Sequence, residues 1–286
     1  MEYIFTEKYK AIKCDLKDIF TFYFWGDVHR DTPTCDVDRW HWFLNSAKKA
    51  DENTYFFCMG DTNDFASISE RKSLERGKIH EETWMRFDNM AERDNRLVAK
   101  EISFMQGKLL GVIDGNHNWI FKNGKTGTED LAERMGTEAL GWLCHYTISF
   151  RFNKSNNTTK QKAIYFVLCH GRAGGKTAGI TINQVDDLRR IFPVADVYCM
   201  AHDHERGAWP KSVLVPTFGE KSLKQKRQFL CRSGSFKRGY VDGQPGYEVG
   251  RLLKPADIGA LKLTIGFHRD TKDSRDRIIT DIKAEI

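Results

Sequence analysis

The chain has 286 residues, of which 40% are hydrophobic, and its formal net charge at pH 7 is +6. This length allows one large α/β domain with its own core, and the modest charge argues against a dedicated nucleic-acid-binding protein while still allowing an anionic substrate. The longest apolar runs, at residues 19–25 and 163–169, are far shorter than the roughly 20 residues that cross a bilayer. We therefore expect no membrane contact and, because no secretory signal is visible, a cytoplasmic location.

In chain order, strand-length apolar runs alternate with segments of helical periodicity, which is typical of α/β folds. Strands are predicted at residues 19–25, 54–59, 109–113, 163–169 and 196–200, and helices around residues 40–47, 81–107 and 182–191. Asp36 or Asp38 can cap the first helix, and Pro193 stops the third. From residue 206 onward the sequence predicts short strands and turns.

In five places a predicted strand runs into Asp, Asn or His side chains. These groups are Asp27-Val-His29, Gly60-Asp61-Thr-Asn-Asp64, Gly115-Asn116-His117, His170-Gly171 and His202-Asp-His204. Ligands of open α/β sheets lie beyond the carboxyl ends of the strands, and parallel neighbouring strands would bring all five groups to one edge. Such a cluster of imidazoles, carboxylates and a carboxamide would satisfy two divalent cations.

Each group also has an ordinary structural explanation when it is taken alone. Asp-x-His and Gly-Asp are common as turn or capping pairs, Asn tolerates unusual backbone angles, and a strand-end His can simply be hydrogen-bonded. The combination favours metal binding, because unrelated turns have no reason to supply metal-ligand side chains at five strand ends. Mixed Asp, Asn and His ligands suit Mn, Fe, Zn or Ni better than Ca.

The order and spacing of these groups resemble the calcineurin-like metallophosphoesterase superfamily, phage and bacterial members included. That family's pattern is Asp-x-His, Gly-Asp-x-x-Asp, Gly-Asn-His-Asp/Glu, His and Gly-His-x-His, and the resemblance covers about residues 20–205. It implies two divalent metal ions. The first would be held by Asp27, His29, Asp61 and His204, and the second by Asp61, Asn116, His170 and His202, so that Asp61 bridges them.

The resemblance further implies hydrolysis of a phosphoester, in which a hydroxide that bridges the two metals attacks the phosphorus. His117, next to the ligand Asn116, would protonate the departing alkoxide. Asp64 would orient this His and keep it protonated. Arg30 and Arg172, which follow two of the ligand groups directly, are candidates for gripping a phosphate oxygen of the substrate.

Three positions depart from the family pattern. Asn118 stands where an Asp or Glu usually follows His117, which weakens the electrostatic support of the site, and Ala201 replaces a Gly. Residues 64–66 read Asp-Phe-Ala where phosphoprotein phosphatases have Asp-Arg-Gly, so their phosphate-gripping Arg is absent. We therefore expect a phosphodiester substrate, in a nucleic acid or a nucleotide. Phosphomonoesterase activity and a non-catalytic metal-binding scaffold are the alternatives.

A single domain spanning residues 1–286 accounts for this pattern most simply. We predict a four-layer α/β/β/α sandwich, in which two mixed β-sheets pack face to face, helices cover the outer faces and the metal site lies at the carboxyl ends of the strands. Residues 206–286 are expected to complete the second sheet, and residues 232–240 to line the same edge as the metals. The Gly-rich residues 174–177 are no nucleotide-triphosphate loop, because residue 170 is His where that motif needs Gly.

Overall fold

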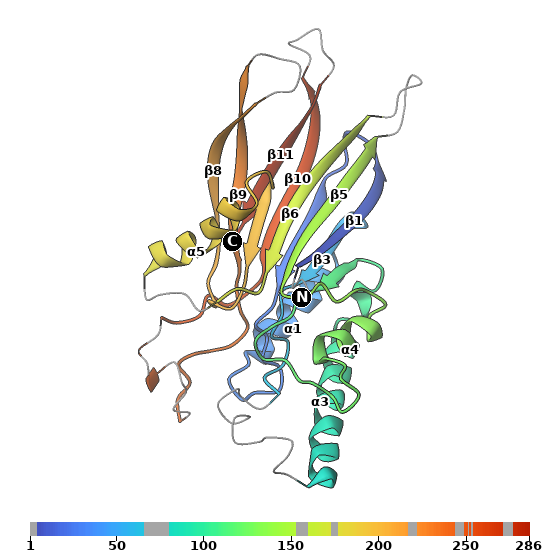
Figure 1. The fold of residues 1–286 in the computed structure, drawn as a ribbon, viewed down its shortest axis with the longest axis vertical. Helices are drawn as coiled ribbons and strands as arrows, with labels where there is room; N and C mark the ends of the chain where they lie inside the picture. The colour runs from blue at the N-terminus through green and yellow to red at the C-terminus, as the bar shows by residue number, and fades with distance from the viewer. Residues whose placement is uncertain are drawn as a thin grey trace.

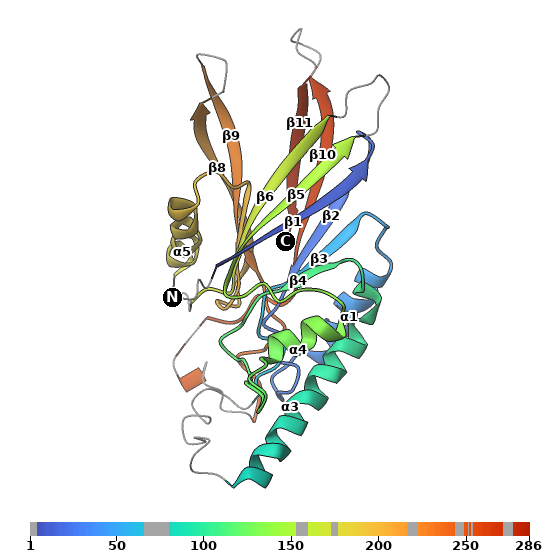
Figure 2. The ribbon, with the colours of Figure 1, turned by 45° about the vertical axis from the view of Figure 1, so that its right-hand side comes forward.

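Two β-sheets form the centre of the molecule in this computed structural model (Figures 1 and 2). One has six strands in the order β1-β5-β6-β7-β9-β8, and the other has five in the order β11-β10-β2-β3-β4. The structure describes residues 5–65, 80–152, 160–172, 177–216, 222–243, 249–250, 252, 254–270 and 277–286. Two motifs discussed above lie partly outside these ranges: the Asp-Phe-Ala motif at residue 66 and the Gly-rich segment at residues 174–176.

The six-stranded sheet mixes parallel and antiparallel pairs. Its strands are β1 (Phe5–Cys14), β5 (Leu143–Phe152), β6 (Gln161–Cys169), β7 (Val197–Met200), β9 (Leu223–Ser233) and β8 (Arg206–Pro216). β7 lies parallel to both β6 and β9, whereas β5 with β6 and β8 with β9 are antiparallel. Consequently β6 and β7 deliver their carboxyl ends to the same edge of this sheet.

The five-stranded sheet places three parallel strands beside an antiparallel pair. Its strands are β2 (Phe20–Trp25), β3 (Thr54–Cys58), β4 (Leu109–Val112), β10 (Leu261–Asp270) and β11 (Arg277–Glu285). β2, β3 and β4 are parallel, and β10 is antiparallel to β2. β2 reads as an almost continuous aromatic run because both of its faces are covered.

Aromatic side chains from both sheets interlock in the layer between them. Phe20 of β2 meets Phe150 of β5 with ring centroids 4.7 Å apart, and Phe22 meets Phe166 of β6 at 5.4 Å. All four rings are fully buried. Burying such side chains stabilises the fold by roughly 1.5–3 kcal/mol each, so this layer fixes the two sheets against each other.

Helices cover the outer faces of both sheets. α1 (Val37–Lys48), α3 (Glu81–Glu101) and α4 (Gly127–Arg134), with the short 3-10 helix η2 (Ser103–Met105), lie on the five-stranded side, and α5 (Ala178–Ile191) lies on the six-stranded side. Apolar side chains of α1 and α3 pack with Trp25 and Phe56 of the five-stranded sheet, and those of α5 pack with Val167 and Tyr198. The predicted four-layer α/β/β/α sandwich is therefore confirmed.

The C-terminal part differs from expectation in where its strands go. Residues 206–286, expected to complete the second sheet, instead divide between both sheets, because β8 and β9 extend the six-stranded one and β10 and β11 the five-stranded one.

Three smaller features of the structure bear on the sequence analysis. Asp36 caps α1 as anticipated, since its side chain accepts a hydrogen bond from the backbone N–H of Arg39. All seven cysteines are free. No helix in the described ranges has the length and apolarity needed to cross a membrane.

Candidate metal centre

The five polar groups come from two different sheets and meet at one end of the sandwich. Those at residues 27–29, 60–64 and 115–117 follow β2, β3 and β4, and those at residues 170 and 202–204 follow β6 and β7. Hydrogen bonds join the two sheets here: the backbone N–H of His202 donates to Asp27 Oδ2 at 2.9 Å, and His170 Nδ1 lies 2.8 Å from the carbonyl oxygen of Met59. The cluster therefore closes the seam between the sheets.

The four side chains expected to hold the second metal converge on one point. His170 Nε2 lies 2.9 Å from Asn116 Oδ1, 3.1 Å from Asp61 Oδ2 and 3.2 Å from His202 Nδ1. Ligand atoms at right angles around an ion, each about 2.1 Å from it, are about 3.0 Å apart. Because Nδ1 of His170 donates to the Met59 carbonyl, its Nε2 presents a lone pair to the cluster. Lone pairs facing one another in this way need a cation between them.

The side chains expected to hold the first metal lie beside this point. Asp27, His29 and His204 each bring one ligand atom into a group whose atoms all lie within 4.8 Å of one another. Asp27 Oδ1 and His29 Nε2 are buried and have no hydrogen-bond partner among the described residues. An unpaired buried polar atom costs about 1–3 kcal/mol, and a metal ion would satisfy both atoms. The residues present thus fit two cations.

Backbone strain is concentrated in the same loops. Seven described residues other than Gly have positive φ angles, and five of these are expected ligands, namely Asp27 (46°), His29 (46°), Asp61 (47°), His202 (68°) and His204 (54°). A left-handed conformation costs an L-residue roughly 1–2 kcal/mol, and such strain collects where a site dictates side-chain direction. The fold therefore holds these loops in unfavourable conformations that aim the ligands at the cluster.

Close backbone approach also requires glycine beside Asp61. A Cβ atom at Gly115 would lie 1.9 Å from Asp61 Oδ1 and 2.5 Å from the Asp61 backbone nitrogen. Real Cβ atoms essentially never come within 3.0 Å of another heavy atom. Gly115 therefore makes room for the carboxylate that is expected to bridge the two metals.

Asp64 connects the expected general acid to a metal ligand. Its Oδ1 atom lies 2.7 Å from His117 Nδ1 and 2.8 Å from His29 Nδ1. Burial alone would raise the pKa of Asp64, but hydrogen bonds from these two imidazoles lower it well below its ordinary range. For His117 burial acts to lower the pKa, but the hydrogen bond to Asp64 together with the negative charges of Asp61 and Asp64 outweighs it, so the pKa is raised. His117 is thus held as a proton donor by Asp64, with Nε2 as its other hydrogen-bonding atom.

The electrostatics of the cluster call for added positive charge. Burial raises the pKa of Asp27 to about 6, whereas for Asp61 the contact with His170 outweighs burial and lowers the pKa far below its usual range. The same contact raises the pKa of His170 to about 9 against the effect of burial. Burial and repulsion from His170 lower the pKa of His202 to about 4, so this imidazole is neutral and suited to ligation. A divalent cation bound here would supply the charge that His170 otherwise carries.

Comparison with solved structures finds only distant similarity. Solved structures similar to the chain include Vps29 from Entamoeba histolytica (9% identity, TM-score 0.38, covering 93% of this chain and 100% of the other), a protein from Streptococcus pneumoniae described as a predicted phosphoesterase (10%, 0.35, 94% and 99%) and the calcineurin-like phosphoesterase YfkN from Bacillus subtilis (9%, 0.33, 94% and 91%). No family model matches the sequence, and no curated protein matches it. These TM-scores are too low to assign a function, so the functional argument rests on the geometry of the cluster.

Arg30 and Arg172, expected to grip the substrate, are engaged elsewhere. The Arg30 guanidinium forms a two-pronged ion pair with Glu101, with Nε 3.1 Å and Nη2 2.9 Å from Oε1, and Trp40 donates to the same carboxylate. Arg30 therefore anchors the end of α3, and its contact with a substrate stays a prediction. Arg172 is an exposed side chain whose Nη2 lies 3.0 Å from Asp187 Oδ2, so no described contact directs it to the cluster.

Two supporting residues were not identified from the sequence. Asp31 accepts hydrogen bonds from the backbone N–H groups of Asp64 and Phe65, at 2.6 and 2.8 Å, and thereby fixes the loop that carries Asp64. Ser235 Oγ donates to the carbonyl oxygen of Asp27 at 2.9 Å. The sequence predicts that residues 232–240 line this edge, but it does not single out Ser235. No motif marks Asp31 or Ser235, because each side chain binds backbone atoms of a distant loop.

Asn118, the residue that follows His117, has a structural role. Its Oδ1 atom accepts a hydrogen bond from the backbone N–H of Thr128 at 3.3 Å, in the first turn of α4. A neutral amide serves this purpose, since the N-terminal N–H groups of a helix need acceptors. Asn118 therefore ties the His117 loop to α4 without adding charge to the cluster.

Proposed function

We propose that this protein is a metallophosphoesterase that hydrolyses a phosphodiester, in a nucleotide or a nucleic acid, with two bound divalent cations. The single observation that carries the proposal is the convergence of atoms from Asp61, Asn116 and His202 within 3.2 Å of His170 Nε2. Two unpaired buried atoms, of Asp27 and His29, lie beside them. Cations in the Mn, Fe, Zn or Ni group suit these ligands.

When bound, the cations would supply Lewis acidity to the phosphoryl oxygens and lower the pKa of a nucleophilic water. The chain's own residues would do the rest. His117 would donate a proton to the departing alkoxide, while Asp64 holds its ring in place and raises its pKa, so that the imidazole takes up a new proton from solvent. His170 is fixed through the Met59 carbonyl, so that its free nitrogen faces the cluster.

The proposed preference for a diester substrate rests on the lysine and arginine side chains near the cluster. The phosphoprotein phosphatase Arg has no counterpart here, because the corresponding position is Phe65, which is buried, and Arg30 is paired with Glu101. Burial, His29 and then Lys237 lower the pKa of His204, and the charge of Lys237 also acts on His117, so the Lys237 ammonium is within electrostatic range of both imidazoles. One lysine suits the single negative charge of a diester better than the double charge of a monoester, so we expect Lys237 to meet the substrate.

The decisive experiment replaces His117 by alanine. In the presence of Mn, we expect turnover of a dinucleotide, whose departing alkoxide needs a proton, to fall by about 10²- to 10⁴-fold, the usual contribution of a positioned acid or base, while the metal content stays at the wild-type level. Turnover of bis(p-nitrophenyl) phosphate should fall much less, because nitrophenolate departs without a proton. His268→Ala is the matched control, since His268 is exposed on β10 and should leave turnover unchanged. Equal dinucleotide turnover in the His117→Ala and wild-type proteins would reject the acid role.

The two alternatives give different results in the same assays. A phosphomonoesterase would hydrolyse p-nitrophenyl phosphate faster than the diester, whereas the proposal predicts the reverse order. A non-catalytic scaffold would bind the metals and hydrolyse neither compound. Both compounds have the same leaving group, so their ratio reports on the charge of the phosphoryl group.

A further inference from the structure

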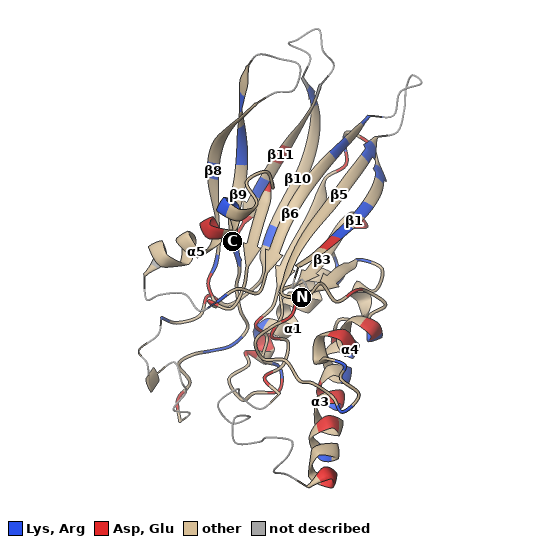
Figure 3. Cartoon of the chain, in the orientation of Figure 1, with Lys and Arg blue, Asp and Glu red and all other residues tan. Residues whose placement is uncertain are grey.

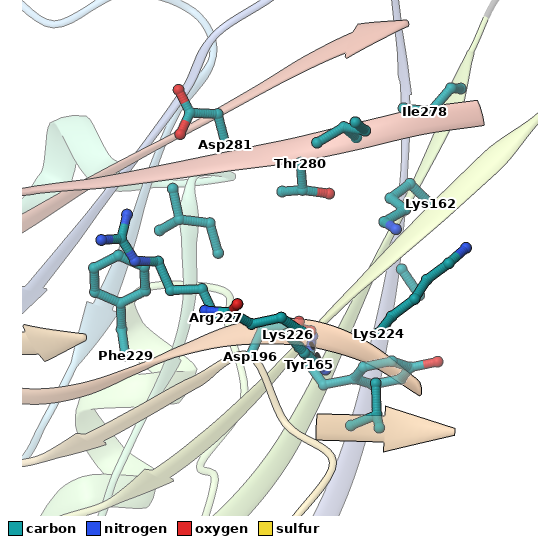
Figure 4. A pocket seen from close by; sticks show the side chains of 15 residues that line it. Lys162, Tyr165, Asp196, Lys224, Lys226, Arg227, Phe229, Ile278, Thr280 and Asp281 are labelled. Carbon is teal, nitrogen blue, oxygen red and sulfur yellow. Dashed lines mark hydrogen bonds and ion pairs between the residues drawn. The ribbon is translucent and has the colours of Figure 1, made fainter. Parts of the chain in front are cut away.

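A second hollow lies at the opposite end of the strands from the metal cluster. It has a volume of about 670 Å³ and is lined by residues near the start of β6, β9 and β11, whereas the metal ligands follow the carboxyl ends of β6 and β7 (Figure 4). Small-molecule sites commonly measure about 300–1,000 Å³. The hollow is thus large enough for a ligand of nucleotide size and plays no part in the proposed hydrolysis.

The hollow arises because β7 is much shorter than its neighbours. β7 pairs with β6 only from Phe166 onward and with β9 only from Phe229 onward. The starting halves of β6 and β9 therefore have no strand between them, and in Figure 2 the upper part of β9 leans away from β6. Side chains of β11 from the other sheet, among them Ile278 and Ile282, form the apolar part of the lining.

The charged residues of the lining leave an excess of positive charge. Among the lining residues, Asp196 is paired with Lys226 at 2.9 Å, and Asp281 lies on the opposite side of β11 from Thr280 (Figure 4). No described carboxylate is within ion-pair distance of Lys162 or Arg227. Lysines and arginines are frequent on these strands, whereas acidic residues gather on α3 and α4 (Figure 3).

An unsatisfied hydroxyl group lines the same hollow. Thr280 Oγ1 is buried and has no hydrogen-bond partner among the described residues, and in Figure 4 its hydroxyl is on the side of Lys162, while the Arg227 guanidinium lies across the hollow beside the Phe229 ring. A hydroxyl can donate to an anionic oxygen. Two cations, a hydroxyl donor and an apolar surface next to them are the complement of a phosphate attached to a flat organic group.

We propose that this hollow is a second binding site, for a nucleotide unit whose phosphate meets Lys162, Arg227 and Thr280 while its base covers Ile278 and Ile282. The unit is either a free nucleotide or part of a single-stranded nucleic acid, since both offer the same phosphate and base. The site is independent of the metal cluster. A strand bound here would be held by the protein at a distance from the hydrolytic end.

Lysines beside unpaired strand edges also protect sheets from pairing with other chains, and the experiment separates this role from ligand binding. Binding is measured by fluorescence anisotropy with a labelled ten-nucleotide single strand, and by competition with AMP, inorganic phosphate and a glutamate decapeptide. The full-length protein carries His117→Ala in every sample so that the strand is not cleaved. The variants are Lys162→Gln with Arg227→Gln, and separately Thr280→Phe, which fills the hollow without changing the charge. Lys13→Gln, an exposed lysine on β1, is the control.

We expect the double variant and Thr280→Phe each to weaken strand binding at least tenfold and Lys13→Gln to leave it unchanged. Displacement by AMP would identify a free nucleotide as the ligand, and failure of AMP to compete would identify a nucleic-acid strand. Wild-type affinity in both hollow variants would overturn the proposal, as would equal competition by the glutamate peptide or by phosphate alone. Turnover of bis(p-nitrophenyl) phosphate by the hollow variants with His117 restored separates this result from the proposed hydrolysis, and we expect it to be unchanged.

Discussion

Replacing Gly115 by alanine should disable the metal centre without altering any ligand. The added Cβ would lie 1.9 Å from Asp61 Oδ1, about 1.5 Å short of an ordinary contact of 3.4 Å, and 2.5 Å from the Asp61 backbone nitrogen. The carboxylate therefore has to move by more than 1 Å, and the hydrogen bond from the His117 backbone N–H to Asp61 Oδ1, now 2.9 Å, has to break. Because the backbone is also crowded, a side-chain rotation alone cannot relieve the contact.

The size of the effect follows from this displacement. A misplacement of about 1 Å can cost about 10²-fold in rate, and overpacking costs about 1–3 kcal/mol of stability. We expect Gly115→Ala to lose at least 100-fold in kcat for bis(p-nitrophenyl) phosphate and to retain less metal after dialysis, measured by mass spectrometry of the metals, while the protein stays folded by circular dichroism. Gly266→Ala is the control, because a Cβ there meets no atom within 4 Å. Wild-type kcat and metal content in Gly115→Ala would refute the bridging position of Asp61.

Two further predictions concern stability. Burial raises the pKa of Glu101, but hydrogen bonds from Arg30 and Trp40 outweigh it and lower the pKa below 4.5, so its stabilisation is present above that pH and is lost as the pH falls through the lowered value. Glu101→Gln should therefore cost about 2 kcal/mol at pH 7 and progressively less below pH 4.5 in urea unfolding; an equal cost at pH 7 and pH 4 would contradict this. Adding Mn to chelator-treated protein should raise the Tm, since an ion at 100 times its Kd stabilises a protein by about 2.7 kcal/mol; an unchanged Tm would show that the native state binds no metal.

The elements that position the site were predictable because their sequences are strongly patterned. β2 is an aromatic run that ends at Gly26-Asp27, and α3 repeats apolar side chains at helical spacing. β1 escaped prediction because it is an edge strand whose charged residues fall on both faces: Glu7 and Lys13 are exposed, and Lys8 and Lys10 are partly buried. α4 is short, and its capping box, formed by Thr126 and Glu129, is a local signal that a closer reading could have used.

The limits of the sequence are clearest in the site itself. The order of the ligand groups predicted a cluster, but it could not reveal that His170 and His202 arrive from a different sheet than Asp61, because strand order depends on long-range pairing. Arg30 follows a ligand directly and so suggested contact with the substrate, yet its partner Glu101 lies 71 residues away. Side-chain direction at such positions is decided by tertiary packing, which no local pattern encodes.

The most direct test of the central claim is anomalous diffraction from crystals grown with Mn. We predict two separate peaks per chain, one against Asp27, His29 and His204 and the other against Asn116, His170 and His202, with Asp61 in contact with both. Ions that share a carboxylate in this way lie about 3.5–4 Å apart. A single peak, or no peak within bonding distance of these side chains, would contradict the two-metal centre.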